Sequence, residues 1–574
     1  MNRKLYGIFL AAVFLALSFL MGCGGSSSST TTTPPPPPPA TSAFAFYLSG
    51  QEAINEGPNY YALAGAVTIT AAGTVTAGEQ DYNDGFGITS PEPSGDTITG
   101  GTLTVDATTG QGTLTLNTNN TAVGASGTET LGVQFVNADH ALITQFDGSA
   151  TSSGSMDFQT LGGTPSGGFA FTLSGVDLSY GPVAIGGVFT IPSAATDEVD
   201  VNDDGDTTTT VAAPLTVSLG TPDAFGRGVL TSSLVYGSTG ILLNYYVVGP
   251  EVIRIIDVDP SVSTGPSDSA VGSAFGQGTN ATGATNASLT ASVFAVSADP
   301  FGDEYGVAGQ ITPNSTPTPA TYSGIAEDVE LDTNFVSGLA GVVGGTYTIA
   351  ANGYGSMTIA GFGGGNVHNL QVYATDPTLD LSDPNNANGN PDVGGALLLE
   401  FESGGPLAGG TGVAIPQTDP TSTDFNGTYA AGWQNFNDFE TGCGDCEFDM
   451  VAQGTMASGG VLSLTGEVSD PFQTLGVGAT TETGATFTST PLPDSINAGR
   501  FSMLSTNSPA NPLAATIGGL SGAFDAIIYQ ASASQLFWLE YDDNSVFVGP
   551  IEEQGTLTGV PAVARPGKAQ AKQK

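Results

Sequence analysis

The heptapeptide FAFYLSG, Phe44 to Gly50, recurs almost unchanged as FAFTLSG, Phe169 to Gly175. Both copies are followed by the same series of short segments, which are rich in Val, Thr, Ile, Phe and Tyr and are separated by Gly, Asn and Asp. Such segments are typical of β-strands joined by tight turns. A series of segments that recurs along a chain indicates repeated structural units. The sequence therefore predicts tandem β modules.

Two further copies complete the chain. They begin at SVFAVSAD, Ser292 to Asp299, and at GTYAAGW, Gly427 to Trp433. We expect four all-β modules, each roughly 110 to 130 residues long, at 42–163, 167–278, 287–418 and 423–556. About eight strands per module favour antiparallel up-and-down barrels, because closure removes the strand edges that would otherwise aggregate. A sandwich of two sheets stays open as the alternative, because the number of strands does not distinguish the two.

The N-terminus has the layout of an export signal, with Arg3 and Lys4 ahead of an apolar run, Leu5 to Met21. The run is shorter than the roughly 20 apolar residues that a membrane span needs. It ends in LMGC at Cys23, which resembles the lipobox of bacterial lipoproteins. The resemblance implies a signal peptide over 1–22 and lipidation of Cys23. Gly24 after the cysteine implies transfer to the outer membrane.

Both flanks of the modules are predicted to lack a core. Residues 23–41 are rich in Ser and Thr and contain six consecutive prolines, which predicts a stalk that is flexible at first and then extended. Residues 557–574 end in RPGKAQAKQK, and we expect this basic tail to be disordered.

The charge balance is strongly acidic, with 54 Asp and Glu residues against nine Lys and Arg. Between Leu5 and Ala564 the basic residues are Arg227, Arg254 and Arg500. So few cations cannot neutralise a phosphate backbone, which excludes nucleic acid as a partner. The acidity keeps a large β protein soluble and would attract cationic partners.

Cys443 and Cys446 lie in the motif CGDC. Outside the cytoplasm two nearby thiols most simply form a disulfide, and we predict one here. Free thiols and an active redox pair are the alternatives. A zinc site would need two more soft ligands, and the neighbouring sequence has none.

A Glu-x-Asp-x-Asn pattern recurs in three modules. It comprises Glu79, Asp81 and Asn83, then Glu198, Asp200 and Asn202, and then Glu330, Asp332 and Asn334, with Asp204 and Asp206 extending the second copy. Alternate residues of a strand share one face, so each triplet aligns oxygen ligands of the kind that calcium prefers. The other interpretation is a solvent-facing strand that runs into an Asp- and Asn-rich turn. Beyond calcium, the sequence predicts no cofactor.

No constellation of catalytic residues stands out, and we predict that the chain is not an enzyme. Its two histidines, His140 and His368, have no nucleophile motif beside them. An acidic residue closes the penultimate strand of every module, at Asp147, Asp259, Glu402 and Asp542. A residue repeated in each module indicates a structural role, since a catalytic pair is normally placed once. Aromatic residues such as Trp433, which could stack on sugars, are interpreted as core.

The arrangement resembles the tandem β repeats of uncharacterised secreted bacterial proteins, and that resemblance implies no particular activity. We predict a protein anchored to the outer membrane by lipid, with its periplasmic or cell-surface face left open. The expected role is structural or adhesive, as a surface rod, with glycans or surface proteins as candidate partners. The alternative is a lipoprotein that binds a glycan or a small apolar ligand. A secreted hydrolase has the least support.

Overall fold

The computed structural model describes residues 41–564 except for 54–58, 86–94, 178–180, 204–205, 210–214, 237–238, 260–268, 299–304, 317, 332–344, 363–365, 387–392, 403–408, 419–425, 438–445, 458–459, 473–479, 495–496, 542–545 and 562. The stalk, the signal segment and Cys23 therefore lie outside the described residues. Within them, no helix has the length and apolar character needed to cross a membrane.

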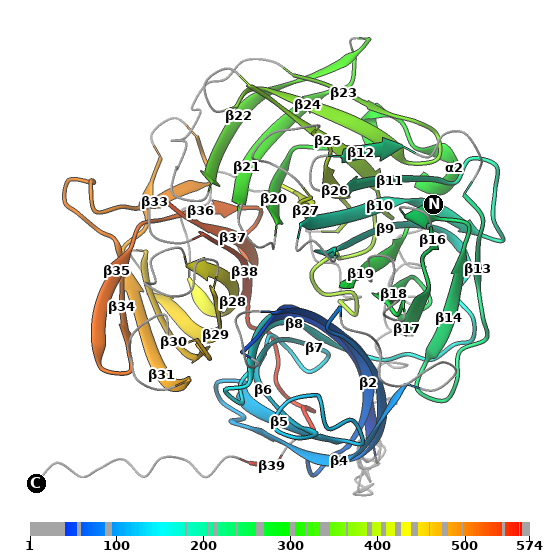
Figure 1. Cartoon of the computed structure of the whole chain (residues 1–574). Coiled ribbons are helices and arrows are strands. Elements are labelled where there is room, and N and C mark those ends of the chain that lie inside the picture. Colours follow the sequence, from blue (N-terminus) through cyan, green and yellow to red (C-terminus); the bar gives the residue numbers. More distant parts are fainter. Residues whose placement is uncertain are drawn as a thin grey trace, which may run out of the picture. The chain divides into compact units, whose positions relative to one another are not determined.

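The first module is a closed antiparallel barrel of eight strands. Its strands are β1 (Thr41–Glu52), β2 (Asn59–Thr70), β3 (Thr74–Asn83), β4 (Asp96–Val105), β5 (Gln111–Thr118), β6 (Thr128–Phe135), β7 (His140–Gln145) and β8 (Ala150–Phe158). Each strand pairs with its neighbours in sequence, and β8 pairs with β1 to close the barrel. The repeated heptapeptide lies in β1, at this closure (Figure 1).

The third module is a second closed barrel of eight strands in the same order. Its strands are β20 (Ser292–Ala298), β21 (Tyr305–Asn314), β22 (Ala320–Leu331), β23 (Gly345–Ile349), β24 (Tyr354–Phe362), β25 (Asn366–Ala374), β26 (Ala396–Glu400) and β27 (Thr411–Pro416). The barrel alternative is thus confirmed over the sandwich for these two modules.

The second and fourth modules are curled antiparallel sheets that do not close among the described residues. The second contains β9 (Gly167–Val176), β10 (Pro182–Ile191), β11 (Glu198–Asp203), β12 (Asp206–Thr209), β13 (Val217–Leu219), β14 (Arg227–Ser232), β17 (Leu243–Gly249), β18 (Val252–Asp257) and β19 (Ser269–Gly276), with β15 (Val235–Tyr236) and β16 (Thr239–Gly240) as a separate pair. The fourth contains β28 (Gly427–Asn437), β29 (Cys446–Ala457), β30 (Val461–Ser469), β31 (Thr481–Ser489), β32 (Leu492–Pro493), β33 (Arg500–Met503), β34 (Leu513–Ile517), β35 (Leu520–Phe524), β36 (Ala526–Gln530), β37 (Gln535–Glu540) and β38 (Val546–Glu553). The predicted all-β fold of tandem antiparallel modules is confirmed.

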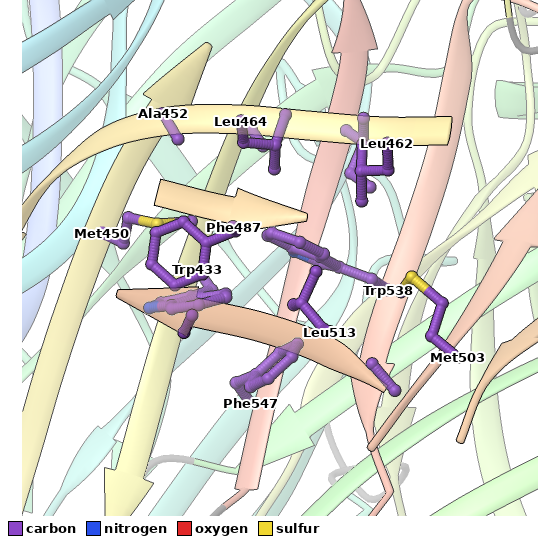
Figure 2. Packing of buried hydrophobic residues seen from close by; sticks show 14 of the residues in the cluster. Trp433, Met450, Ala452, Leu462, Leu464, Phe487, Met503, Leu513, Trp538 and Phe547 are labelled. Atoms are coloured by element: carbon purple, nitrogen blue, oxygen red, sulfur yellow. The ribbon is translucent and has the colours of Figure 1, made fainter. Parts of the chain in front are cut away.

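Each sheet curls around an apolar core of its own. In the fourth module this core centres on Trp433, whose ring centroid lies 4.5 Å from that of Phe547, 4.9 Å from that of Trp538 and 5.0 Å from that of Phe487. Figure 2 shows these rings pointing toward one another between the strands. Trp433 is fully buried, so it is not available as a sugar platform on the surface.

The outer faces of several strands are buried as well, because neighbouring modules cover them. On β2 the inward residues include Leu63 and Val67, while the outward residues Ala62, Ala64 and Ala66 belong to a second apolar cluster shared with modules two and three. Small side chains let the backbones of two sheets approach. This explains why the segment YYALAGAVTIT is apolar on both faces, whereas a half-exposed strand alternates with polar residues.

The modules contact one another in a closed cycle. Strand β2 packs against β17, β18 and β19, β10 against β25 and β26, β21 against β36, β37 and β38, and β29 against β6, β7 and β8. The last contact joins the fourth module back to the first. We expected a surface rod from the tandem repeats, and the extended shape that this implies is wrong. In an extended row the first and fourth modules would not touch, whereas here they pack against each other.

The connections add two further features. Helix α2 (Asn280–Gly283) and the short 3₁₀ helix η1 (Asn286–Ser288) link modules two and three. At the C-terminus, β39 (Val563–Ala564) pairs in parallel with β4 of the first barrel, and Leu557 and Val560 pack on that barrel's core. The expectation of disorder was therefore wrong at the start of the 557–574 tail, because its apolar residues have a surface to cover; residues 565–574 lie outside the described part.

Candidate functional site

The acidic residue of the third strand occupies an equivalent place in every module. The strand register pairs Asp81 with Ala64, Asp200 with Gly186, Asp328 with Ala308 and Glu467 with Val451. All four acidic side chains are buried. The interpretation of these strands as solvent-facing is therefore wrong, because the next module covers the face that carries the acids.

The register also corrects the third copy of the acidic pattern. We predicted it at Glu330, Asp332 and Asn334, whereas the residue equivalent to Asp81 and Asp200 is Asp328. A pattern of period two looks the same after a shift of four residues, so the sequence did not fix the register. Asp332, Asn334 and the side chain of Glu330 lie outside what the structure describes.

At the junction of modules one and two, Asp81 forms a two-pronged ion pair with Arg227 on β14. Arg227 Nε and Nη2 donate to the Asp81 carboxylate at 2.8 and 2.9 Å. Tyr246 OH and Asn244 Nδ2, both on β17, donate to Asp81 Oδ2 at 2.8 and 3.1 Å. Glu79 lies 3.5 Å from Arg227 Nε, and burial raises its pKa to about 7. The Arg227 guanidinium thus supplies the positive charge beside Asp81.

At the junction of modules two and three, tyrosines replace the arginine. Tyr354 OH and Tyr373 OH donate to the two oxygens of Asp200 at 3.0 and 2.9 Å. Asn202 Nδ2 donates to the Glu400 side chain at 2.9 Å. Burial raises the pKa of Glu400 to about 9, with the neighbouring Glu402 adding to the shift.

The junction of modules three and four repeats the arrangement of the first junction. Arg500 Nε and Nη2 on β33 donate to Asp328 at 2.6 and 2.8 Å. Tyr529 OH on β36 also donates to Asp328 Oδ2. The first and third junctions thus use two of the three arginines of the modules.

The fourth junction, between modules four and one, is built differently. Its buried acids are Glu447 and Asp449 on β29 and Glu467 on β30. Thr151 Oγ1 on β8 donates to Asp449 Oδ2 at 2.7 Å, and the backbone N–H of Glu447 donates to Gln51 Oε1 at 2.9 Å. Burial raises the pKa of Asp449 to about 7. The contacts at this junction thus include hydrogen bonds from a threonine hydroxyl and a backbone N–H.

The third arginine, Arg254 on β18, lies where all four modules meet. It bonds Asp157 of the first module through Nη2, and its guanidinium carbon lies 4.6 Å from the centre of the Tyr47 ring. Asp157 Oδ1 is also 2.8 Å from His140 Nδ1, and His140 Nε2 is 3.5 Å from Glu552 of the fourth module. Burial alone would lower the pKa of His140, but Glu552 and Asp157 together raise it well above its usual range.

Arg254 and His140 lie beside a central cavity of about 310 Å³. Residues of all four modules line it, among them Tyr47, Thr172, Thr411 and Phe537. A wider polar pocket of about 670 Å³ lies next to it, lined by the first, third and fourth modules, and the two share Ser382 and Glu552.

A segment of the third module after β25 crosses over this centre. Asn137 Nδ2 of the first module donates to Asp383 at 2.5 Å, and Asn385 Nδ2 donates to the Phe158 carbonyl at 3.1 Å. Gln535 of the fourth module donates to Ser382. This Asn-rich segment therefore holds modules together over its described part, and its residues 387–392 lie outside that part.

The remaining predicted sites are placed as follows. Cys446 is buried at the start of β29 and is disulfide-bonded, while Cys443 lies outside the described residues, so their pairing stays a prediction. Within the described part, no three His, Cys, Asp or Glu side chains lie close enough together to hold a metal. Asp204 and the side chain of Asp206 lie outside it. Calcium binding stays a prediction, tested by melting the protein in calcium and in EDTA.

Sequence reasoning found two of the third-strand acids, Asp81 and Asp200, and missed the partners of both. Arg227, Arg254 and Arg500 were noted as rare cations and were given no role. Their scarcity was a usable signal. Charged side chains are rarely buried unless they are paired, so in a chain with many acids and three arginines in its modules, each arginine is the expected partner of a buried acid.

No family model matches the chain, and no curated protein matches its sequence. Among solved structures, intact Ap-TbpB with its N and C lobes is 10% identical and covers 73% of this chain and 84% of its own, with a TM-score of 0.19. A double mutant of transferrin binding protein B from Haemophilus parasuis is also 10% identical, covering 74% and 83%, with a TM-score of 0.19. A DUF3598 protein from Nostoc punctiforme is 12% identical and covers 46% and 96%, with a TM-score of 0.15. Likeness at this level carries no argument about this chain.

Proposed function

We propose that the protein is a non-enzymatic, lipid-anchored surface protein of the outer membrane, whose four modules act together as one structural or adhesive body. The observation that carries the proposal is the set of buried polar contacts at the four junctions. These contacts are Asp81 with Arg227, Asp200 with Tyr373, Asp328 with Arg500 and Asp449 with Thr151.

These contacts favour a body that moves as a unit. Separating a junction would break these hydrogen bonds, which typically contribute about 1.5–3 kcal/mol each when one partner is charged, and would expose the apolar surface that the modules bury against one another. Contacts between domains within a chain are otherwise often weak enough to permit relative motion. A surface protein that resists separation of its modules is suited to bearing load or holding a partner. The N-terminal LMGC motif supports attachment through Cys23.

The charge of the molecule supports a particular class of partner. The formal net charge is −45, and all three arginines of the modules are engaged with acids inside the molecule. A surface protein or glycan that carries positive charge is therefore favoured over an anionic one. The same charge argues against nucleic acid.

Protease shaving of intact cells tests the location. Peptides from the modules should be released from cells that carry the wild-type chain, while a periplasmic protein stays intact as the leakage control. The Cys23→Ser variant should lose its attachment to the membrane fraction. Protection of the modules until the outer membrane is broken would overturn the surface location.

An adhesion assay tests the role. Cells that lack the chain should attach less to glycan-coated or protein-coated surfaces than cells that carry it, and the wild-type gene should restore attachment. If the protein is surface-exposed but its loss changes neither attachment nor envelope integrity, the proposed role is contradicted.

A further inference from the structure

We propose that the central cavity is a binding site for a small, neutral, oxygen-rich molecule of about the size of a monosaccharide. The inference concerns the inside of the four-module body and does not depend on the surface role proposed above.

The size of the cavity suits one small molecule. Its volume is about 310 Å³. That is at the lower end of the roughly 300–1,000 Å³ of typical ligand sites. About ten water molecules occupy the same volume in the liquid. It lies where the four modules meet, and clefts between domains are a common location for ligand sites.

The lining combines hydroxyl groups with aromatic rings. Ser49, Ser153, Thr172, Ser174 and Thr411 bring hydroxyls from three modules, and Phe275 and Phe537 bring rings from the second and fourth. Hydroxyls donate and accept hydrogen bonds, so they suit a ligand that does both. Aromatic faces suit the C–H faces of a sugar ring. Aliphatic side chains such as Leu381 and Val413 complete the lining, so the site offers hydroxyls beside apolar surface and favours a ligand that has both polar groups and C–H faces.

A buried donor points to an acceptor on the ligand. Arg254 is almost completely buried and lines the cavity, and its Nε–H has no hydrogen-bond acceptor among the described residues. His140 Nε2 lies 3.5 Å from Glu552, which is longer than an ordinary N–H···O hydrogen bond. Buried donors are normally satisfied by protein groups or by ordered water. A hydroxyl or ring oxygen of the ligand would satisfy them.

The charges around the cavity favour a neutral ligand. The cationic Arg254 and His140 are matched by the carboxylates of Asp157 and Glu552, so the four charges cancel. The adjoining polar pocket carries Asp139, Asp380, Asp383 and Glu553, which would repel an anion on its way in. A cation would meet these acids first and would then face Arg254 inside. A neutral ligand is therefore favoured both by the polar pocket and by the central cavity.

Calorimetric titration and thermal melting of the full soluble chain test the proposal. The probes are glucose, galactose and N-acetylglucosamine, with glucuronate as an anionic and glucosamine as a cationic counterpart that keep the sugar ring. We expect at least one neutral probe to bind at millimolar concentration or below and to raise the melting temperature, and to bind about tenfold or more tightly than its charged counterparts. Absence of binding by every neutral probe, or equal binding of the charged ones, would overturn the proposal.

Three variants locate the site. Arg254→Met removes the donor, and Ser153→Phe fills the cavity without changing a charge; both should weaken binding about tenfold or more. Arg227→Met is the matched control, because it removes an equally buried arginine from a junction that does not line the cavity. It should lower the melting temperature and leave the affinity unchanged. Equal affinity in Ser153→Phe and the wild type would place the probe elsewhere and refute the central site.

Discussion

At the scale of single residues, one acidic position of the third strand joins the modules at three of the four junctions, and its partners differ between them. Asp81 faces the guanidinium of Arg227, whereas Asp200 faces the neutral hydroxyls of Tyr354 and Tyr373. The equivalent aspartates therefore pair with a cation in one junction and accept hydrogen bonds from neutral hydroxyls in the other. Neutralising them should have unequal consequences.

We expect Asp81→Asn to lower the free energy of unfolding by about 3–5 kcal/mol, because it leaves Arg227 buried without its carboxylate. Asp200→Asn should cost about 1 kcal/mol, because the amide oxygen still accepts from the tyrosine hydroxyls. Urea denaturation of both variants measures the difference. Equal losses would show that the ion pair is not what distinguishes the two junctions.

At the scale of elements, the second strand of the first module is specialised for contact on both of its faces. Its outward alanines are fully buried against the second module, while the residues on its inward face fill the barrel. A larger outward side chain would have to push two sheets apart, and closely packed interfaces tolerate this poorly.

Replacing Ala64 by Leu should therefore destabilise the protein by about 1–3 kcal/mol through overpacking. Thr102→Leu on β4 is the control, since Thr102 is exposed and lies in the same barrel; a change there should stay within about 0.5 kcal/mol. Thermal melting of the two variants separates them. If Ala64→Leu melts like the wild type, the junction has more room than the structure indicates.

At the scale of the whole molecule, buried carboxyls make the stability depend on pH. Burial raises the pKa of Glu52 and Glu129 to about 8, of Asp449 to about 7 and of Glu400 to about 9. Between the usual pKa of such a group near 4 and its raised value, the folded state holds a proton that the unfolded state has released, so stability falls as pH rises. His140, with its raised pKa, acts in the same direction. Asp157, with a pKa lowered to about 2, contributes its stability above about pH 4 and does not oppose this trend.

We expect the melting temperature to fall steadily as the pH rises from about 5 to about 8. Glu400→Gln should make this slope shallower, because an amide does not titrate. Thr102→Ser, at an exposed side chain on β4, should leave the slope unchanged, because it removes no titratable group. A melting temperature that rises over this range would contradict the assignment of protons to the buried carboxyls.

The sequence by itself determined the units of the fold. The recurrence of FAFYLSG as FAFTLSG and the alternating segments after it depend on local patterns, and these predicted four all-β modules. The alternation also predicted that Asp81 and Asn83 share one face of a strand, and both bond the second module, Asp81 through Arg227 and Asn83 through the Asp257 carbonyl. Such patterns can be recognised in the sequence because the side chains of a strand alternate between its two faces, whatever surrounds the strand.

Only the tertiary structure decided what that face meets. A shift of four residues leaves the alternation unchanged, so register alone identified Asp328 as the third equivalent acid. The pairing of Asp81 with Arg227, and the meeting of Arg254, Asp157, His140 and Glu552, join residues from different modules. These contacts depend on how curled sheets pack against one another around the cycle. That packing is set by complementary shapes and charges far apart in sequence, and no local pattern records it.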